Sequence, residues 1–220
     1  MQIIDIRQSI YDNNDREAAL LREQLRRQKT FLLNLMASPG AGKTTTLRSV
    51  LPLLKDEFKI GVLQADIDSD VDARAMAEAG FDAVQLHTGG MCHHDAGMTR
   101  QGLEAIGSER YDLIVLENVG NLVCPAEFDT GAVKNAAILS VPEGDDKPLK
   151  YPLMFQVANL LVINKTDTLG VFDFDVDKAC TRARRRNPEI EILCISAKTG
   201  EGVDRLADWL RREIRCWIGG

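Results

Sequence analysis

The sequence lacks the features that mark membrane, nucleic-acid-binding and disulfide-stabilised proteins. No apolar run approaches the roughly 20 residues that span a bilayer, and the first residues lack the basic and apolar regions of a signal peptide. The 27 basic residues are outnumbered by 33 acidic ones, and a net charge of −6 argues against an extended nucleic-acid surface. The five cysteines are scattered without a C-x-x-C pair, which is not typical of a disulfide framework. We therefore expect a cytoplasmic protein that binds neither membranes nor nucleic acid.

What the sequence has is a regular alternation of strand-like and helix-like segments. Its 220 residues, 45% of them hydrophobic, suit one α/β domain with a small appendage. Apolar runs typical of strands cover residues 31–36, 60–65, 81–86, 111–117, 136–141, 159–163 and 190–195. Helix-like patterns cover residues 45–54, 98–106, 175–186 and 203–214, and a polar loop covers 142–152. This order predicts an α/β fold, a mostly parallel sheet with helices on both faces.

The chain is expected to divide near residue 30. Residues 1–30 read as an N-terminal helical extension in which Asn14 and Asp15 cap an amphipathic helix. A packing role for this helix is favoured over partner docking. Residues 31–220 form the predicted P-loop domain.

The sequence around residue 40 has the form of a P-loop. A strand-like run is followed by A-S-P-G-A-G-K-T from Ala37 to Thr44, and then by a helical pattern. The predicted phosphate-binding residues are Gly40, Ala41, Gly42, Lys43, Thr44 and Thr45. Lys43 would reach the β- and γ-phosphates and the Thr44 hydroxyl would ligate Mg²⁺. Ala37 replaces the usual first glycine, which requires a negative φ at that position.

Two acidic segments follow predicted strands and therefore lie at the ligand-binding edge of the sheet. Asp66 and Asp72 bound a run of alternating carboxylates, and we expect Asp66 to serve Mg²⁺ and Asp72 to position the attacking water. A helix start favoured by the helix dipole is the alternative for this run. Glu117 ends another strand and is the second candidate Mg²⁺ ligand, and Gly120 offers its backbone N–H to the γ-phosphate.

Two later motifs predict that the base is guanine. Asn164, Lys165 and Asp167 form N-K-x-D after a strand, and a carboxylate there accepts hydrogen bonds from guanine N1–H and its amino group. Adenine offers no donor at N1, so the same carboxylate would be left unpaired. About thirty residues later another strand ends in the S-A-K triplet of Ser196, Ala197 and Lys198. We therefore predict GTP hydrolysis to GDP, with Mg²⁺ as cofactor.

Cys92, His93 and Cys124 form a second candidate site. Both segments that carry them follow elements of the nucleotide site. Thiolate and imidazole ligands suit Zn²⁺ or Ni²⁺. A fourth ligand could be water, His94 or a side chain of a second subunit. The alternative is a buried small residue at Cys124 and a solvated histidine pair.

These segments together resemble the HypB family, the GTPases of nickel delivery in nickel–iron hydrogenase maturation. The resemblance covers residue 30 to the C-terminus and rests on five stretches: A-S-P-G-A-G-K-T-T, T-G-G-M-C-H-H-D-A, E-N-V-G-N-L-V-C-P, D-D-K-P-L-K-Y-P and N-K-T-D. It implies a SIMIBI-type P-loop GTPase and a GTP-dependent homodimer. It also implies a HypA-like metallochaperone and the hydrogenase large-subunit precursor as partners. Cys92, His93 and Cys124 match the family's shared Ni²⁺ or Zn²⁺ site.

The sequence departs from the family pattern at three points, and three rival functions are considered: a urease-type nickel GTPase, a small-molecule P-loop kinase, and a dimerisation or scaffolding module with bound nucleotide. The residue after Cys-His is often leucine in the family and is His94 here, Ala37 departs from the P-loop pattern, and the Cys-rich or His-rich stretches that some members carry are missing. A urease-type nickel GTPase would be expected to carry Cys-Pro-His, whereas Cys-His and Cys-Pro lie in separate segments here. A small-molecule P-loop kinase would have no reason to carry the guanine motifs.

Overall fold

The predicted apolar segments form parallel strands, with the P-loop strand at the centre. The computed structural model describes residues 6–66, 71–91 and 93–220. In this part of the chain the strands are β1 (Phe31–Ala37), β2 (Ile60–Asp66), β3 (Asp82–His87), β4 (Leu113–Glu117), β5 (Lys134–Ser140), β6 (Leu160–Asn164) and β7 (Glu191–Cys194). They form one sheet in the order β3-β2-β4-β1-β5-β6-β7, and every pairing is parallel. This confirms the predicted α/β fold and leaves the carboxyl ends of β1, β4 and β6 at one edge.

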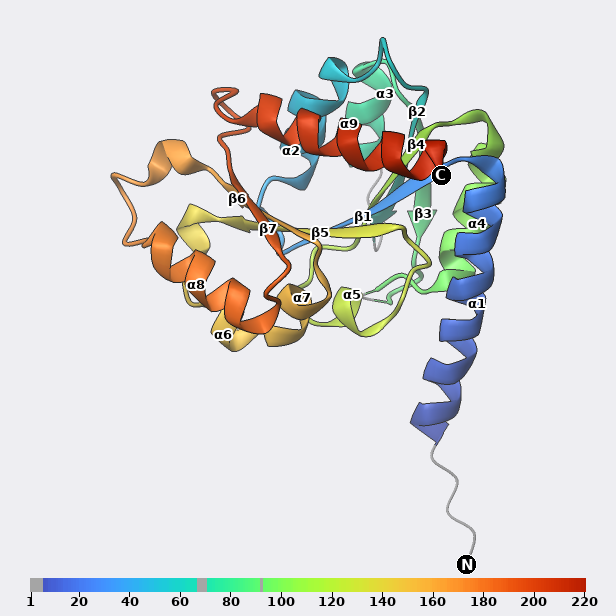
Figure 1. Ribbon diagram of the computed structural model, residues 1–220, viewed down its shortest axis with the longest axis horizontal. Helices are drawn as coiled ribbons and strands as arrows, with labels where there is room; N and C mark the ends of the chain where they lie inside the picture. Colours follow the sequence, from blue (N-terminus) through green and yellow to red (C-terminus); the bar gives the residue numbers. More distant parts are fainter. Residues whose placement is uncertain (1–5, 67–70, 92) are drawn as a thin grey trace, which may run out of the picture.

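Helices cover both faces of the sheet (Figure 1). The described α-helices are α1 (Ile6–Gln28), α2 (Lys43–Val50), α3 (Val71–Glu78), α4 (Ala96–Ile106), α5 (Cys124–Glu127), α6 (Lys147–Lys150), α7 (Pro152–Val157), α8 (Val176–Arg186) and α9 (Val203–Gly219). Short 3₁₀ turns η1 (Leu51–Leu53), η2 (Ser108–Arg110), η3 (Val141–Glu143) and η4 (Thr166–Thr168) join them. Every residue of β1 is buried, as expected for a strand covered on both faces.

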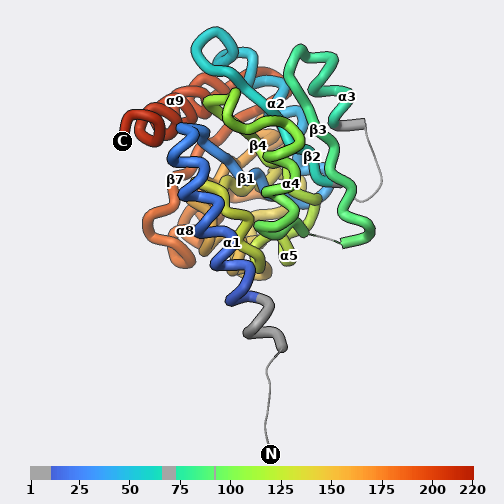
Figure 2. Tube along the Cα trace, turned by 90° about the vertical axis from the view of Figure 1, so that its right-hand side faces the viewer, coloured from blue at the N-terminus to red at the C-terminus, as the bar shows by residue number. Residues whose placement is uncertain are grey.

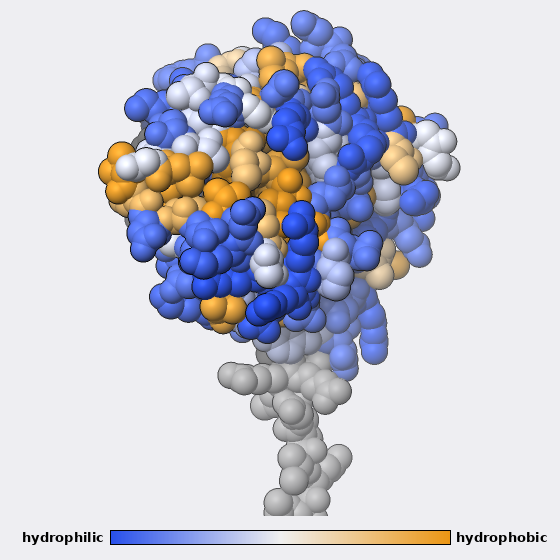
Figure 3. Space-filling model, turned by 60° about the vertical axis from the view of Figure 1, so that its left-hand side comes forward, coloured by the Kyte–Doolittle hydropathy of each residue, from blue (hydrophilic) through white to orange (hydrophobic). Residues whose placement is uncertain are grey.

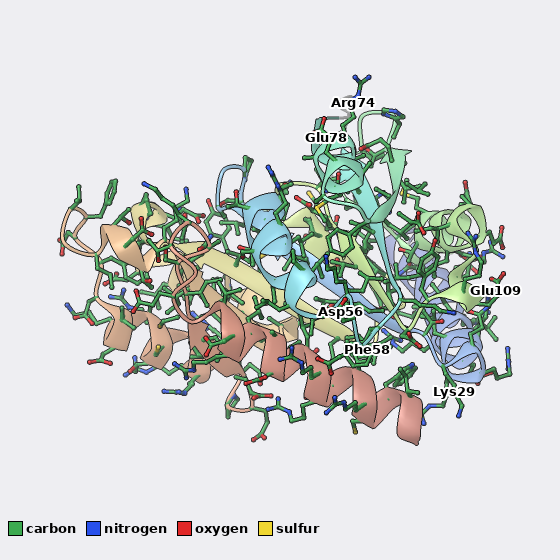
Figure 4. The ribbon with its side chains drawn as sticks, turned by 90° about the horizontal axis from the view of Figure 1, so that it is seen from above. Lys29, Asp56, Phe58, Arg74, Glu78 and Glu109 are labelled. Atoms are coloured by element: carbon green, nitrogen blue, oxygen red, sulfur yellow. The ribbon has the colours of Figure 1, made fainter. Side chains whose placement is uncertain are left out.

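Residues at alternate positions of β1 pack in different hydrophobic clusters. Phe31, Leu33 and Leu35 pack in a cluster with residues of α2, α3 and α9. Leu32 packs with α1 and α4, and Met36 packs with α7 and α8. Seen from above, α9, α2 and α3 lie over the first face (Figure 4), and α2 contacts both of the others. Within the described residues, no helix is long and apolar enough to cross a membrane.

The N-terminal helix differs from its prediction. We expected Asn14 and Asp15 to cap it, but α1 already includes Ile6, so both lie inside the helix. Leu21 and Leu25 are buried in the core that α1 shares with α4, and Figure 2 shows the two helices side by side. Burial of one leucine side chain contributes roughly 1.5–3 kcal/mol. The packing role is observed, and the division of the chain at residue 30 stays a prediction.

The segment 142–152 also differs from its prediction as a polar loop. It contains most of η3, all of α6 and the start of α7. Ser140 and Glu143 form a capping box, and a proline stands in the first turn of each of these three short helices. Helices of three to six residues are too short to show a periodic pattern, which is why the sequence reading missed them.

Candidate functional site

The P-loop connects the end of β1 to the start of α2. Gly40 (φ 75°) and Gly42 (φ 99°) both lie in the left-handed region, which glycine adopts without the steric cost of a Cβ atom. Ala37 is the last residue of β1 and does not have a positive φ, so the condition set by the sequence is met. Helix α2 begins directly after this turn, at Lys43. The first N–H groups of a helix lack intrahelical partners, and phosphate oxygens are their natural acceptors.

Thr44 and Glu117 meet beside this turn. Thr44 Oγ1 donates to Glu117 Oε1 at 2.8 Å, and Gln64 Nε2 donates to Glu117 Oε2 at 2.7 Å. Glu117 ends β4 and is 4% exposed. A hydroxyl and a carboxylate at the phosphate end of a P-loop are the oxygen ligands that Mg²⁺ takes together with phosphates and water. The chemistry of these two side chains therefore fits that ion.

A small polar cavity lies next to Glu117. Its volume is about 30 Å³, and its lining includes Lys43, Gln64, Gln85 and Gly120. Within the part of the chain that the structure describes, Gln64 Oε1 and both polar atoms of the Gln85 side chain are buried without a hydrogen-bond partner. Buried polar atoms are rarely left unpaired in native proteins, and a space of this size holds a water molecule. The arrangement suits a water molecule or a phosphate oxygen as the missing partner.

The segment after β4 rests on the P-loop. A Cβ atom on Gly120 would lie 3.2 Å from Pro39 Cα, so the two backbones are in close contact. Cys124 begins α5 four residues later. The P-loop therefore contacts the backbone only four residues before Cys124.

Asn164 joins the N-K-x-D and S-A-K motifs to the P-loop. Its Nδ2 donates to Ala41 O at 3.0 Å, and its Oδ1 accepts from Ala197 N at 3.1 Å. Asp167 Oδ1 accepts from Ser196 Oγ at 2.7 Å, which ties the N-K-x-D segment to the S-A-K segment. These contacts bring the two motifs to one place although about thirty residues separate them.

A cavity of about 320 Å³ lies between these motifs. It is lined by Gly42, Thr45, Asn164, Lys165, Asp167, Thr168, Ala197 and Lys198. Lys165 has φ 62°, and its Nζ donates to Gly40 O at 2.7 Å. The Lys165 side chain therefore crosses from the base motif to the phosphate loop, a link that the sequence pattern did not indicate.

Two of the predicted carboxylates are placed only in part. Asp66 is the last residue of β2 and pairs in register with His87, and Asp72 lies in the first turn of α3. The positions of these two side chains are not described, so their catalytic roles stay predictions. The run between them, residues 67–70, lies outside the described residues. Gln64, two residues before Asp66, is a β2 residue whose side chain contacts Glu117. The only feature of the sequence that could have indicated this contact is that Gln64 is a polar residue inside an apolar strand.

The structure describes two of the three candidate metal ligands, His93 and Cys124. Cys92 lies outside the described residues. The His93 ring stacks on Phe128, with centroids 4.0 Å apart and planes 6° apart. Asn121 Nδ2 donates to Cys124 Sγ at 3.4 Å. Among the residues that the structure describes, no three His, Cys, Asp or Glu side chains form a metal cluster, so the predicted site is untested without Cys92.

His94 is buried beside this site. It is 1% exposed, and its Nδ1 has no hydrogen-bond partner among the described residues. Burial lowers the pKa of His94 to about 4, while Asp95 opposes the shift. His94 is therefore neutral at pH 7.

Comparisons with known proteins show which family and which structures the chain is similar to. Residues 31–194 match the protein family described as "CobW/HypB/UreG, nucleotide-binding domain". The chain is 44% identical to "Hydrogenase maturation factor HypB" of Azotobacter chroococcum over 212 residues, 96% of this chain and 70% of the relative. It is 36% identical to "Hydrogenase/urease maturation factor HypB" of Helicobacter pylori, over 96% of this chain and 88% of the relative. The crystal structure of Helicobacter pylori HypB in complex with nickel superposes with a TM-score of 0.86 and 38% identity, covering 92% and 95% of the two chains.

Proposed function

The chain belongs to the HypB family of hydrogenase maturation factors, and from that premise we propose that it is a GTPase that couples GTP binding and hydrolysis to the delivery of nickel into a nickel–iron hydrogenase precursor. The observation that carries the nucleotide half is the 2.8 Å hydrogen bond between Thr44 and Glu117. It joins the P-loop to the carboxyl end of β4, where a P-loop hydrolase needs its Mg²⁺ ligands.

In the proposed hydrolysis, each side chain of the site has its own task. Lys43 and the α2 N-terminus hold the β- and γ-phosphates. Thr44 and Glu117 hold Mg²⁺, which when bound neutralises charge on the β- and γ-phosphate oxygens. Gln64 and Gln85 line the cavity next to Glu117, and the polar atoms for which the described residues supply no partner, Gln64 Oε1 and both amide atoms of Gln85, would bind a water molecule there. Asp66 and Asp72 keep their proposed roles at the Mg²⁺ ion and the attacking water.

The proposed base is guanine. Asp167 lines the cavity of about 320 Å³ with Asn164, Ala197 and Lys198, which is where a base would bind. Asp167 is exposed in the nucleotide-free protein. A bound base would cover its carboxylate, which would pair with the two donors on the guanine edge but find no donor at N1 of adenine.

Nickel is the proposed cargo, held by Cys92, His93 and Cys124, and zinc could occupy the same ligands. Support comes from the nickel complex of the 38% identical Helicobacter pylori protein. Coupling is supported by the contact between Gly120 and Pro39 of the P-loop, because Gly120 lies four residues before Cys124. Loss of the γ-phosphate would release this segment and with it one ligand, which is order–disorder switching of the kind found in GTPases.

A GTP-dependent homodimer, a HypA-like metallochaperone partner and a cytoplasmic location are also proposed. Support for a protein interface comes from exposed apolar side chains: Leu149, Leu153, Val171 and Phe172 are between 39% and 79% exposed. Figure 3 shows apolar residues gathered in a band on one side of the molecule. Apolar patches of this kind mark protein interaction sites more often than chance.

The test combines a phosphate-release assay with a nickel titration. Phosphate release should be faster with GTP than with ATP and should require Mg²⁺. Nickel affinity of the wild-type protein and of Cys92→Ala should be measured with GDP and with a non-hydrolysable GTP analogue. The proposal expects a nucleotide-dependent affinity in the wild type and weak binding in the variant. Identical nickel affinity in both nucleotide states would refute the coupling.

A second recipient of nickel is favoured by one observation. The Helicobacter pylori relative is named as a factor for both hydrogenase and urease. Transfer of ⁶³Ni from the loaded protein to purified apo-hydrogenase precursor and to apo-urease would separate the two.

A small-molecule kinase would instead show phosphate on an acceptor other than water.

A further inference from the structure

Helix α1 contacts both segments that carry the proposed metal ligands. Asn14 of α1 accepts a hydrogen bond from Ala96 N at 3.0 Å through Oδ1, and Ala96 follows the loop of His93. The same side chain donates to Asp129 O at 3.0 Å through Nδ2, and Asp129 lies five residues after Cys124. Asn14 is only 7% exposed. One buried amide thus spans the gap between the two ligand-bearing segments.

An aromatic stack makes the same connection. The ring of Phe128 lies parallel to the His93 ring at 4.0 Å, and on α1 the Tyr11 ring lies 5.2 Å from Phe128, tilted by 35°. Aromatic pairs at these separations attract each other beyond the area that they bury. A parallel stack also limits rotation of the imidazole, and this rotation decides where its ring nitrogens point.

Further contacts hold the 128–132 segment along the same face of α1. Arg22 forms an ion pair with Asp129, and its Nε donates to Ala132 O at 2.9 Å. A Cβ atom on Gly131 would lie 2.7 Å from the Leu21 side chain, so backbone and helix are in direct contact. The α1 residues involved, at positions 11, 14, 21 and 22, recur at helical spacing on one side.

We infer that α1 sets the geometry of the metal site, with Asn14 and Phe128 as positioning residues for the ligands His93 and Cys124. This rests on the proposed metal site. Asn14 fixes the separation of the two segments, and Phe128, backed by Tyr11, fixes the plane of the His93 ring. A ligand oriented before the ion arrives loses less freedom on binding, which raises affinity.

The experiment is a Ni²⁺ titration of the full chain followed by thiolate-to-nickel charge-transfer absorption. Phe128→Leu keeps an apolar side chain but removes the ring, and Phe128→Tyr keeps the ring. Asn14→Ala removes the bridge, and Asn13→Ala, an exposed neighbour on the same helix, is its matched control. Loss of groups that orient a ligand typically weakens metal binding 10- to 100-fold. We expect at least a tenfold loss for Phe128→Leu and Asn14→Ala, and less than a threefold change for Phe128→Tyr and Asn13→Ala.

The outcomes separate the inference from the proposed function. The absorption band should shift in Phe128→Leu, which a merely structural role would not produce, while GTP affinity and circular dichroism stay at wild-type values. Wild-type affinity and an unshifted band in Phe128→Leu and Asn14→Ala would overturn the inference. His93→Ala is the reference: if the wild type binds no Ni²⁺, or if His93→Ala binds it equally well, the proposed metal site itself is wrong.

Discussion

Substitution of Gly42 by alanine should damage the link between the P-loop and the guanine motif. Gly42 has φ 99°, and a Cβ atom there would lie 2.6 Å from Asn164 Nδ2, closer than real Cβ contacts. Asn164 is 1% exposed and holds Ala41 O and Ala197 N through its two polar atoms. The added methyl group must push this amide away from at least one of these partners.

Gly40 provides the matched control because it shares the backbone strain but not the contact. Its φ is 75°, and a Cβ atom there would meet none of the described residues within 4 Å. The left-handed conformation costs an alanine about 1–2 kcal/mol at either position. A buried polar group that loses its partner costs about 1–3 kcal/mol more. We therefore expect Gly40→Ala to lower the free energy of unfolding by roughly 1–2 kcal/mol and Gly42→Ala by roughly 2–5 kcal/mol.

The assay is urea unfolding of the nucleotide-free protein, followed by fluorescence of its two tryptophans. Nucleotide is left out because both glycines lie in the phosphate-binding turn. The entropy that alanine removes from the unfolded chain is common to both variants and cancels in the comparison. The double variant Gly42→Ala/Asn164→Ala should be less destabilised than the sum of its parts. Equal destabilisation by Gly40→Ala and Gly42→Ala, or strict additivity in the double variant, would refute the reasoning.

Three further predictions address the site. Glu117→Gln keeps the shape of the side chain but removes its charge, so the Mg²⁺ concentration for half-maximal phosphate release should rise at least tenfold; an unchanged requirement would exclude Glu117 as a ligand. Asp167→Asn should reduce the preference for GTP over ATP by about 100-fold or more in competition binding, and an unaltered preference would place the base elsewhere. The pKa of His94 falls from 6.5 to about 4 on burial, so the unfolded chain binds this proton more tightly. The free energy of unfolding of metal-free protein should therefore drop by roughly 3 kcal/mol between pH 6.5 and 4. His94→Leu should flatten this slope, and an identical slope in both proteins would contradict the burial argument.

Much of the fold was readable from the sequence because the signals are local. Each apolar run became a parallel strand, and the long periodic segments became α2, α4, α8 and α9. The short helices α5, α6 and α7 were missed, since four to six residues carry no period. The role predicted for Asn14 was wrong: it does not cap α1 but lies inside it, and its side chain accepts a hydrogen bond from the first turn of α4, 82 residues away. The sequence contains no signal for such a contact.

The sequence by itself determined which chemical groups stand at the strand ends: Lys43, Thr44, Glu117, Asn164 and Asp167. Only the tertiary structure decided which of them touch. In the folded protein Gln64 of β2 donates to Glu117, Lys165 donates to the P-loop, and Phe128 stacks on His93. Residue types and spacing follow from the chain alone, whereas contacts between segments depend on strand order and side-chain packing. Those are properties of the whole folded molecule.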